Sequence, residues 1–349
     1  MNILGQTGRF VTTRILPNVL PKHQLLFSFG LQALTLTPYE SLGSNARLVV
    51  ENLSTASSKI YRLVSNKTLL TNFHRLVRES GLVKKTSLVN VDFSTFCGFQ
   101  ALCFGVQTEK GRALPVWNAS IIYPIKFVGS QNIFVLEQLQ KFGETLGFYP
   151  RFVFDRGFWI PCVMKFLLKE NIHFYLRIKK GQQLYWVKQG KKQKAIVIGK
   201  ITKDAMISLF GYKLRLIVSP PPPKQQNPKK KQNTERWYIL TNDMETSKDG
   251  ILETYDTRFE IEETFKDHKH IQKLKVLHIR KIETFTILLW FASLAQWLAW
   301  WIKGCSSEKP ARQVNPKKKR SFFRIFWEEL QFALRAEGLK SIAILPSPG

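Results

Sequence analysis

The chain has 349 residues, of which 44% are hydrophobic, enough for one large domain or two ordinary domains with a real core. Its 53 Lys and Arg residues against 25 Asp and Glu give a formal net charge of +28, which indicates a polyanionic partner, nucleic acid first and an anionic membrane surface second. The four cysteines have no CxxC spacing and no nearby His pair, which argues against a structural zinc site and suits a reducing compartment.

Residues 1–86 are predicted to form a helical, polar and basic N-terminal region, with NKTLLTNFHRLVRESG as its clearest amphipathic segment. This region carries no recognisable motif, and binding of DNA ends is a possible role for it. A strand-rich region starts at residue 87. LVNVDF, FQALCFGVQT and ALPVWNASIIYPI alternate or run apolar and are separated by turn residues, which predicts a three-stranded meander.

Helices and strands then alternate along the chain. IFVLEQLQKFGETLG has apolar residues at helical spacing, and RFVFDRGF is a short buried strand that ends at Asp155. IPCVMKFLLKEN is predicted to be the next helix and IHFYLRIKK the next strand. This β-β-β-α-β-α-β order predicts an α/β fold with a mixed sheet covered by helices.

Residues 176–240 interrupt this alternation with further predicted strands. SPPPPKQQNPKKKQN, within this segment, is too rich in Pro and Lys to be packed core. After it, TSKDGILETY opens a helix, with Thr246 and Asp249 at the spacing of a capping box.

Residues 285–302, FTILLWFASLAQWLAWWI, are long enough to span a bilayer. Thr286, Ser293 and Gln296 lie inside this run, and it is the only run of its kind in the sequence. A helix buried in an α/β core is therefore the favoured interpretation, and a membrane span is the alternative. Residues 305–349 form a basic tail with the cluster PKKKR and a last predicted helix, FFRIFWEELQFALRAEG.

The segment YDTRFEIEETFKDHK mixes five carboxylates with cations in a strongly basic chain. At about 100° per residue, one arc of roughly 60° on a continuous helix collects four residues, Tyr255, Arg258, Glu262 and Lys269. A second group is predicted to form an ordinary solvated stripe: Asp256, Glu260, Glu263 and Asp267.

Three acids stand out by their location: Asp92 in the first strand of the sheet, Asp155 at the end of the fourth, and Glu262 on the helix. In a mixed sheet of this order the first and fourth strands are plausible neighbours, so their acids would lie side by side. Carboxylates gathered in this way repel unless a cation holds them, and Mg²⁺ or Mn²⁺ prefers such oxygen ligands. Two such ions can activate a nucleophile and stabilise a leaving oxygen.

The spacing Tyr255-x2-Arg258-x3-Glu262-x6-Lys269 resembles the YREK signature of bacterial insertion-sequence DDE transposases, in the branch named after insertion sequence four. VNVDFS and FVFDRGF look like the two strands that carry the aspartates of that family. The resemblance covers about residues 87–304. It implies an RNase H-like mixed sheet with flanking helices, interrupted by a β-rich insertion at 176–240.

The resemblance also implies roles for the matching residues. Asp92, Asp155 and Glu262 would be the catalytic residues and would hold Mg²⁺ or Mn²⁺, as two ions. The DNA-binding residues would be Tyr255, Arg258 and Lys269, near the scissile phosphate, together with Trp237. The family places a base-stacking Trp in its insertion, whereas the residues around Trp237 by themselves favour a core aromatic.

The implied activity is cleavage of the ends of the protein's own mobile element and their joining to target DNA. The expected partners are terminal inverted repeats and target DNA, with a homodimer assembled on DNA and no membrane. The expected location is the bacterial cytoplasm, at the nucleoid. Two alternatives stay open: a metal nuclease of the same fold without strand transfer, and a non-catalytic DNA-binding remnant.

Overall fold

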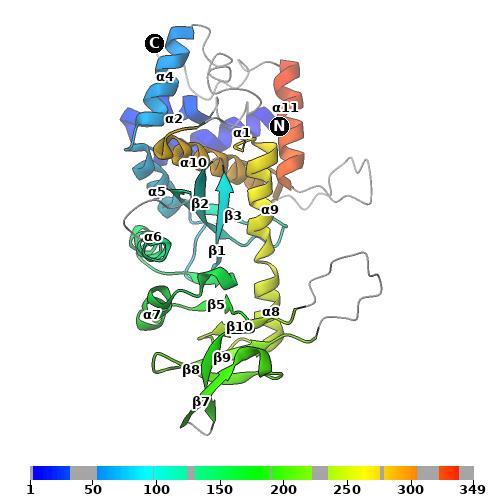
Figure 1. Cartoon of the computed structure of the whole chain (residues 1–349). Coiled ribbons are helices and arrows are strands. Elements are labelled where there is room, and N and C mark those ends of the chain that lie inside the picture. The colour runs from blue at the N-terminus through cyan, green and yellow to red at the C-terminus, as the bar shows by residue number, and fades with distance from the viewer. Residues whose placement is uncertain are drawn as a thin grey trace.

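The computed structural model describes residues 3–31, 53–96, 98–123, 130–188, 191–221, 235–275, 279–304 and 322–337. Its centre is a ten-stranded sheet in the order β3-β2-β1-β4-β5-β10-β9-β8-β6-β7 (Figure 1). The strands are β1 (Leu88–Phe96), β2 (Phe99–Val106), β3 (Leu114–Ile122), β4 (Arg151–Phe154), β5 (Phe174–Arg177), β6 (Gln183–Lys188), β7 (Lys191–Val197), β8 (Ala205–Leu209), β9 (Tyr212–Val218) and β10 (Tyr238–Thr241).

Ten α-helices are described, together with short 3₁₀ and π-helical turns. The α-helices are α1 (Ile3–Phe10), α2 (Gln24–Gly30), α4 (Leu53–Ser65), α5 (Leu69–Glu79), α6 (Gln131–Leu146), α7 (Pro161–Lys169), α8 (Lys248–Asp256), α9 (Phe259–Lys266), α10 (Ile282–Ala299) and α11 (Phe322–Glu337). Two of the short turns flank the site described below, the 3₁₀ turn η5 (Arg156–Phe158) and the π-helical turn η7 (Asp267–Ile271).

Strands β1 to β5 have the RNase H-like arrangement that the sequence predicted. β1, β2 and β3 form an antiparallel meander, and β4 then pairs with β1 in parallel and β5 with β4 in parallel. Parallel neighbours need a crossover, which α6 and α7 provide. Helix α6 starts where the Ser130 side chain accepts a hydrogen bond from the Ile133 amide, and it ends at Gly147, whose left-handed φ of 77° favours glycine.

Helices cover both faces of this sheet, with α8 and α9 on one side and α6 and α7 on the other (Figure 1). The pleat explains the division, because successive side chains of a strand point to opposite faces. On one face Val153 packs with Ile251 and Tyr255 of α8. On the other, Phe152 and its neighbours pack with the apolar side of α6 and α7. The core is therefore built in three layers.

Helix α10 is buried at one end of the sheet, as the favoured interpretation of this apolar run predicted. It packs on β3, where the Trp297 indole donates to the Pro115 carbonyl at 2.7 Å and Asn118 donates to the Ser293 hydroxyl at 2.9 Å. Among the described residues, Ile282–Lys303 is the one helix long and apolar enough to cross a membrane, and most of it is buried within the fold. Such burial is typical of a core helix.

The described helices before residue 86 pack against α10 rather than forming a core of their own. The Phe27 ring lies 5.1 Å from Phe73 and 5.2 Å from Phe291 of α10, centroid to centroid. One hydrophobic cluster runs from these helices into the sheet. The division of the chain into domains, and a DNA-end role for residues 1–86, stay predictions.

The β-rich insertion extends the same sheet. Strands β6 to β9 lie between β5 and β10 in the chain, and β10 pairs antiparallel with both β5 and β9. The insertion strands therefore form the end of the sheet opposite to α10 (Figure 1). Most of the Pro- and Lys-rich segment and the whole of the later PKKKR cluster lie outside the described residues.

The prediction of one continuous helix over residues 255–269 is wrong. Helix α8 ends at Asp256, α9 begins at Phe259, and the π-helical turn η7 follows from Asp267. The predicted capping box is also wrong. The N-cap of α8 is Ser247, whose side chain accepts from the Gly250 amide at 3.2 Å, while the Thr246 hydroxyl donates to Asp243 at 2.6 Å.

Candidate active site

Asp92 and Asp155 are neighbours across two parallel strands. The last paired residues of β1 and β4 are Val91 and Phe154, so the two aspartates follow in register on strands about 4.8 Å apart. The Tyr255 hydroxyl of α8 donates to Asp155 Oδ1 at 3.2 Å, which fixes the face of the sheet on which Asp155 lies. The prediction that the first and fourth strands bring these acids together is confirmed.

Glu262 is linked to the aspartates through Arg258. The Arg258 guanidinium donates through Nη1 to Asp92 Oδ2 at 3.3 Å and through Nη2 to Glu262 Oε1 at 2.5 Å. The Arg258 side chain is only 4% exposed, against 20% for Asp92 and 41% for Glu262. A buried cation thus bridges two carboxylates that belong to different elements.

Arg258 owes its position to the break between α8 and α9. At this break the Thr257 hydroxyl donates to Gln107 Oε1 at 2.6 Å, and Asn90 of β1 donates to the Thr257 carbonyl at 3.4 Å. Gln107 in turn donates to Asn90 Oδ1 at 2.7 Å and to the Thr254 carbonyl at 3.2 Å. Asn90 and Gln107 therefore donate to the Thr257 and Thr254 carbonyls, which would bond only within the helix if it were continuous. These hydrogen bonds stabilise the break between α8 and α9.

Burial raises the pKa of Asp92 from 3.8 to about 6. The Arg258 charge and the Phe93 amide, which donates to Oδ1 at 2.7 Å, oppose this rise, whereas the Asp155 and Glu262 charges add to it. Burial therefore disfavours the charged form of Asp92. A cation that bound there would offset this effect.

Tyr255 is fully buried, and its ring packs between two further groups. The Trp237 ring meets it edge-on at a centroid distance of 5.3 Å, and the Arg258 guanidinium carbon lies 5.8 Å from its centre. Trp237 is partly buried and also lies 6.4 Å from the Phe259 ring. Trp237 is thus part of the aromatic packing around Tyr255, and base stacking by it stays a prediction.

Lys269 lies one helical segment farther along, in η7. Its ammonium group is 5.1 Å from the centre of the Phe96 ring. Burial and the nearby Lys275 lower the pKa of Lys269, and the Asp92 charge opposes this shift. The structure therefore brings Tyr255, Arg258 and Glu262 together with both aspartates, while Lys269 lies at the margin of the cluster.

Two residues of the predicted solvated stripe are in fact buried. The Glu260 carboxylate, 6% exposed, accepts from the Thr108 and Gly111 amides at 2.8 Å each. Asp267, 4% exposed, accepts from Arg112 Nε at 2.5 Å. Both acids fasten α9 and η7 to the turn between β2 and β3. The helical wheel did not reveal the burial of these two acids, because it assigns residues to helix faces without showing which donors a neighbouring element presents to them.

The donor set fits a divalent ion in its chemistry. Asp92, Asp155 and Glu262 supply the carboxylate oxygens that Mg²⁺ or Mn²⁺ takes as ligands. Within the described part of the chain, however, no three acidic, His or Cys side chains are close enough together to hold an ion. The Arg258 guanidinium lies between Asp92 and Glu262 instead.

Comparisons with known proteins give a family match and a similar solved structure. None of the curated proteins compared with the chain matches it. Among solved structures, the chain is similar to a piggyBac transposase in a cryo-EM structure of its synaptic complex with hairpin DNA, with 11% identity, a TM-score of 0.43, and coverage of 99% of this chain and 73% of that one. A family model described as "Transposase DDE domain" matches residues 135–298, a range that contains Asp155 and Glu262 and starts after the strand of Asp92. Over residues 135–298, the chain is thus similar to the transposase DDE domain.

Proposed function

We propose that the protein is a DNA transposase that cleaves the ends of its own mobile element and joins them to target DNA by metal-dependent phosphoryl transfer. One observation carries the proposal: in an RNase H-like strand order, the register sets Asp92 beside Asp155, and Arg258 links Asp92 to Glu262. The match of residues 135–298 to the transposase DDE domain supports it.

Asp92, Asp155 and Glu262 are the residues that would hold Mg²⁺ or Mn²⁺, as two ions. Such ions supply activation of the attacking water and neutralisation of charge on the phosphate. The chain's own groups set the geometry. Tyr255 orients Asp155 through its hydroxyl, and the break at Thr257 turns Arg258 toward the sheet. Lys269, beside the cluster, is the cation proposed to contact a phosphate near the scissile bond.

The net charge of +28 suits the DNA partner, since a polyanion offsets such an excess. The finer features of the proposal follow from the YREK spacing: membership of the branch named after insertion sequence four, recognition of terminal inverted repeats, and a homodimer assembled on DNA in a bacterial cytoplasm. Water would attack the phosphodiester first, and the freed 3′-hydroxyl would then attack target DNA at the same carboxylates.

Two other functions fit the same fold. A metal nuclease would cleave but produce no strand-transfer products, and a non-catalytic remnant would bind DNA without nicking it. The transposase is favoured because the four residues of the YREK spacing occur together with both aspartates in the matching order.

The test uses labelled DNA that carries the sequences flanking the gene, incubated with the protein and Mg²⁺ and resolved on a gel. The native protein should release 3′-ends and join them to a target plasmid. Asp155→Asn and Glu262→Gln should abolish both products and spare DNA binding. Glu263→Gln is the matched control, because this neighbouring glutamate is 38% exposed and pairs with Lys266. Cleavage without joining would establish the nuclease, and full activity of Asp155→Asn or Glu262→Gln would remove that carboxylate from the site.

A further inference from the structure

Two arginines share one carboxylate oxygen close to the carboxylate cluster. Arg156 Nη1 lies 3.3 Å from Glu235 Oε2, and Arg177 Nη2 lies 3.2 Å from the same oxygen. The three side chains differ in exposure: Arg177 is 9% exposed, Glu235 31% and Arg156 49%. The group is therefore anchored on its inner side and reachable from solvent on its outer side.

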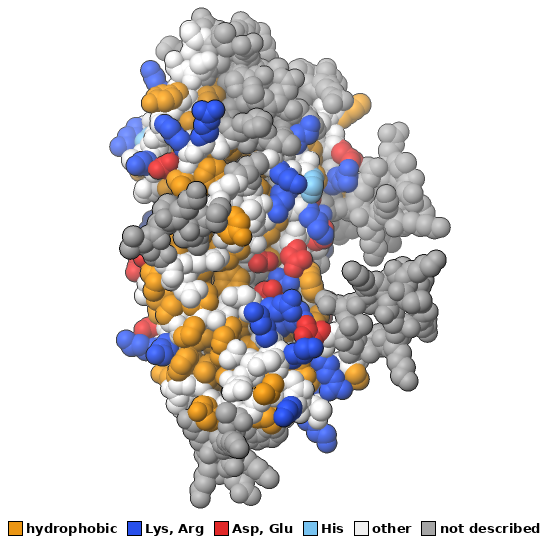
Figure 2. Space-filling view, viewed as in Figure 1, with side chains coloured by type: hydrophobic (Ala, Val, Ile, Leu, Met, Phe, Trp, Pro, Cys, Tyr) orange, Lys and Arg blue, Asp and Glu red, His pale blue; other side chains and the backbone are white. Residues whose placement is uncertain are grey.

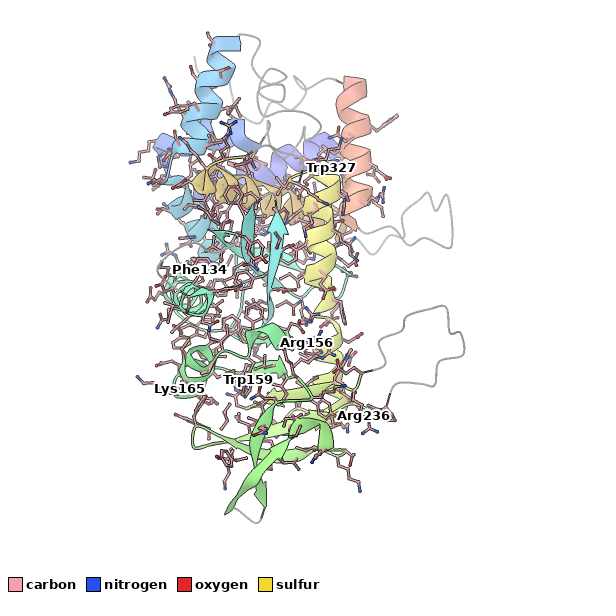
Figure 3. The ribbon with its side chains drawn as sticks, in the orientation of Figure 1. Phe134, Arg156, Trp159, Lys165, Arg236 and Trp327 are labelled. Atoms are coloured by element: carbon pink, nitrogen blue, oxygen red, sulfur yellow. The ribbon has the colours of Figure 1, made fainter. Side chains whose placement is uncertain are left out.

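The fold places this group directly beside the candidate active site. Arg156 follows Asp155 in the chain, and Arg177 ends β5, which runs parallel to the strand of Asp155. The Arg177 charge also opposes the rise in pKa that burial causes in Tyr255, the hydrogen-bond partner of Asp155. Figure 2 shows Lys and Arg side chains gathered next to Asp and Glu side chains on this face, and Figure 3 shows Arg156 beside the α8–α9 ribbon.

We propose that Arg156 and Arg177 form a binding site for a DNA phosphate next to the scissile one, and that Glu235 fills this site until the DNA displaces it. The inference rests on the proposed function, because it presumes a DNA strand at Asp155. It adds two cations and one regulatory carboxylate that the YREK spacing does not contain.

The chemistry of the three groups supports an exchange of ligands. A guanidinium presents the same planar fork of donors to a carboxylate and to a phosphate. A phosphate oxygen can therefore take the place of Glu235 Oε2 between the two arginines. Two cations and one anion leave a charge of +1, so the group still attracts a phosphate while Glu235 is bound.

Displacing Glu235 from Arg156 costs little free energy, because this pair is exposed to solvent. The Arg156–Glu235 pair is half-exposed, and pairs of this kind contribute little to stability. Arg177 is held in the sheet and keeps its place when Glu235 leaves. The incoming phosphate would thus meet one buried donor, Arg177, and one exposed donor, Arg156.

The experiment measures binding of a short labelled duplex of arbitrary sequence, in EDTA so that no cleavage occurs, over a series of salt concentrations. Glu235→Gln keeps the size of the side chain and removes its charge, so affinity should rise several-fold. Arg156→Ala should weaken binding and reduce the slope of log affinity against log salt by about 0.9, the value for one phosphate contact. Melting temperatures of both variants should stay close to that of the native protein.

Matched controls come from α11, where Arg324 and Glu328 form an exposed pair at 3.2 Å. Arg324→Ala and Glu328→Gln should leave affinity and slope unchanged. Weaker or unchanged binding by Glu235→Gln would overturn the inference, because the trio would then be a structural ion-pair group. Native protein that binds no DNA would overturn the proposed function as well, whereas native binding with unaffected variants refutes the phosphate site alone.

Discussion

Replacing Arg258 by Met tests whether this residue acts as an internal counter-ion. The substitution keeps an unbranched side chain and removes the charge between Asp92 and Glu262. Loss of one partner from a fully buried ion pair costs about 3–5 kcal/mol. Here about 2 kcal/mol is expected, because Asp92 is 20% and Glu262 41% exposed. With about 2 cal/mol/K of unfolding entropy per residue over 349 residues, the metal-free Tm should fall by about 3 °C.

The same substitution should tighten binding of a divalent ion. In the native protein an added ion would have to compete with the guanidinium for Asp92 Oδ2 and Glu262 Oε1. Arg258→Met removes the competitor, so Mn²⁺ affinity, measured by calorimetry, should rise several-fold. Added Mn²⁺ should therefore raise the Tm of the variant more than that of the native protein.

Arg324→Met on α11 is the matched control, since this arginine is 61% exposed and its loss should change stability by less than about 0.5 kcal/mol. Arg258→Lys should fall between Met and the native protein, because one ammonium cannot bridge both carboxylates in the same way. An unchanged Tm with unchanged Mn²⁺ affinity would refute the bridging role. It would leave Arg258 with only the phosphate contact that the YREK spacing implies.

Three further predictions concern residues around the site. Glu260→Ala leaves the Thr108 and Gly111 amides without their acceptor and should lower the free energy of chemical unfolding by about 3 kcal/mol. Glu263→Ala should lower it by less than about 0.5 kcal/mol, and equal losses would contradict the buried position of Glu260. Burial lowers the pKa of His268 to about 3, below its unfolded value near 6.5, so the folded protein loses stability as the pH falls below 6.5. Between pH 7 and 5 the free energy of unfolding should fall by about 2 kcal/mol. His268→Leu should abolish this pH dependence. A variant with the native pH profile would exclude His268 as its source. Trp237→Ala should lower stability by about 2 kcal/mol through lost packing on Tyr255, and Trp237→Phe should restore most of it; an Ala variant that keeps its Tm but loses DNA binding would favour base stacking instead.

The parts of the fold that the sequence predicted are those set by short-range patterns. Apolar alternation separated by turn residues predicted the β1–β2–β3 meander, and the strand order then implied that β1 and β4 are neighbours. The prediction that Asp92 and Asp155 lie side by side used that adjacency, and their role in the site was implied by the resemblance to the transposase family. Their register, with Val91 opposite Phe154, is given by the structure.

The rest could not be predicted, because it depends on what distant elements offer to each other. Nothing in the sequence around Thr257 shows that Asn90 and Gln107 will bind its backbone and hydroxyl and so interrupt the helix. The helical wheel likewise placed Glu260 in solvent, although its carboxylate accepts hydrogen bonds from the Thr108 and Gly111 amides of a turn about 150 residues earlier. A polar residue on a helix is exposed only if the neighbouring element leaves it so.

The pairing of β10 with β5 has a consequence for how this chain can change over evolutionary time. The chain leaves the RNase H-like sheet at Arg177 and returns at Tyr238, on a strand directly hydrogen-bonded to the one it left. The residues between Arg177 and Tyr238 form an insertion, and its two ends stay one strand spacing apart whatever the insertion's length. The strands β6 to β9 can lengthen, shorten or be replaced without moving β1 or β4, provided that Glu235 and Trp237 keep their contacts with Arg156, Arg177 and Tyr255. The distal part of the insertion can thus diversify separately from the carboxylates within one continuous sheet.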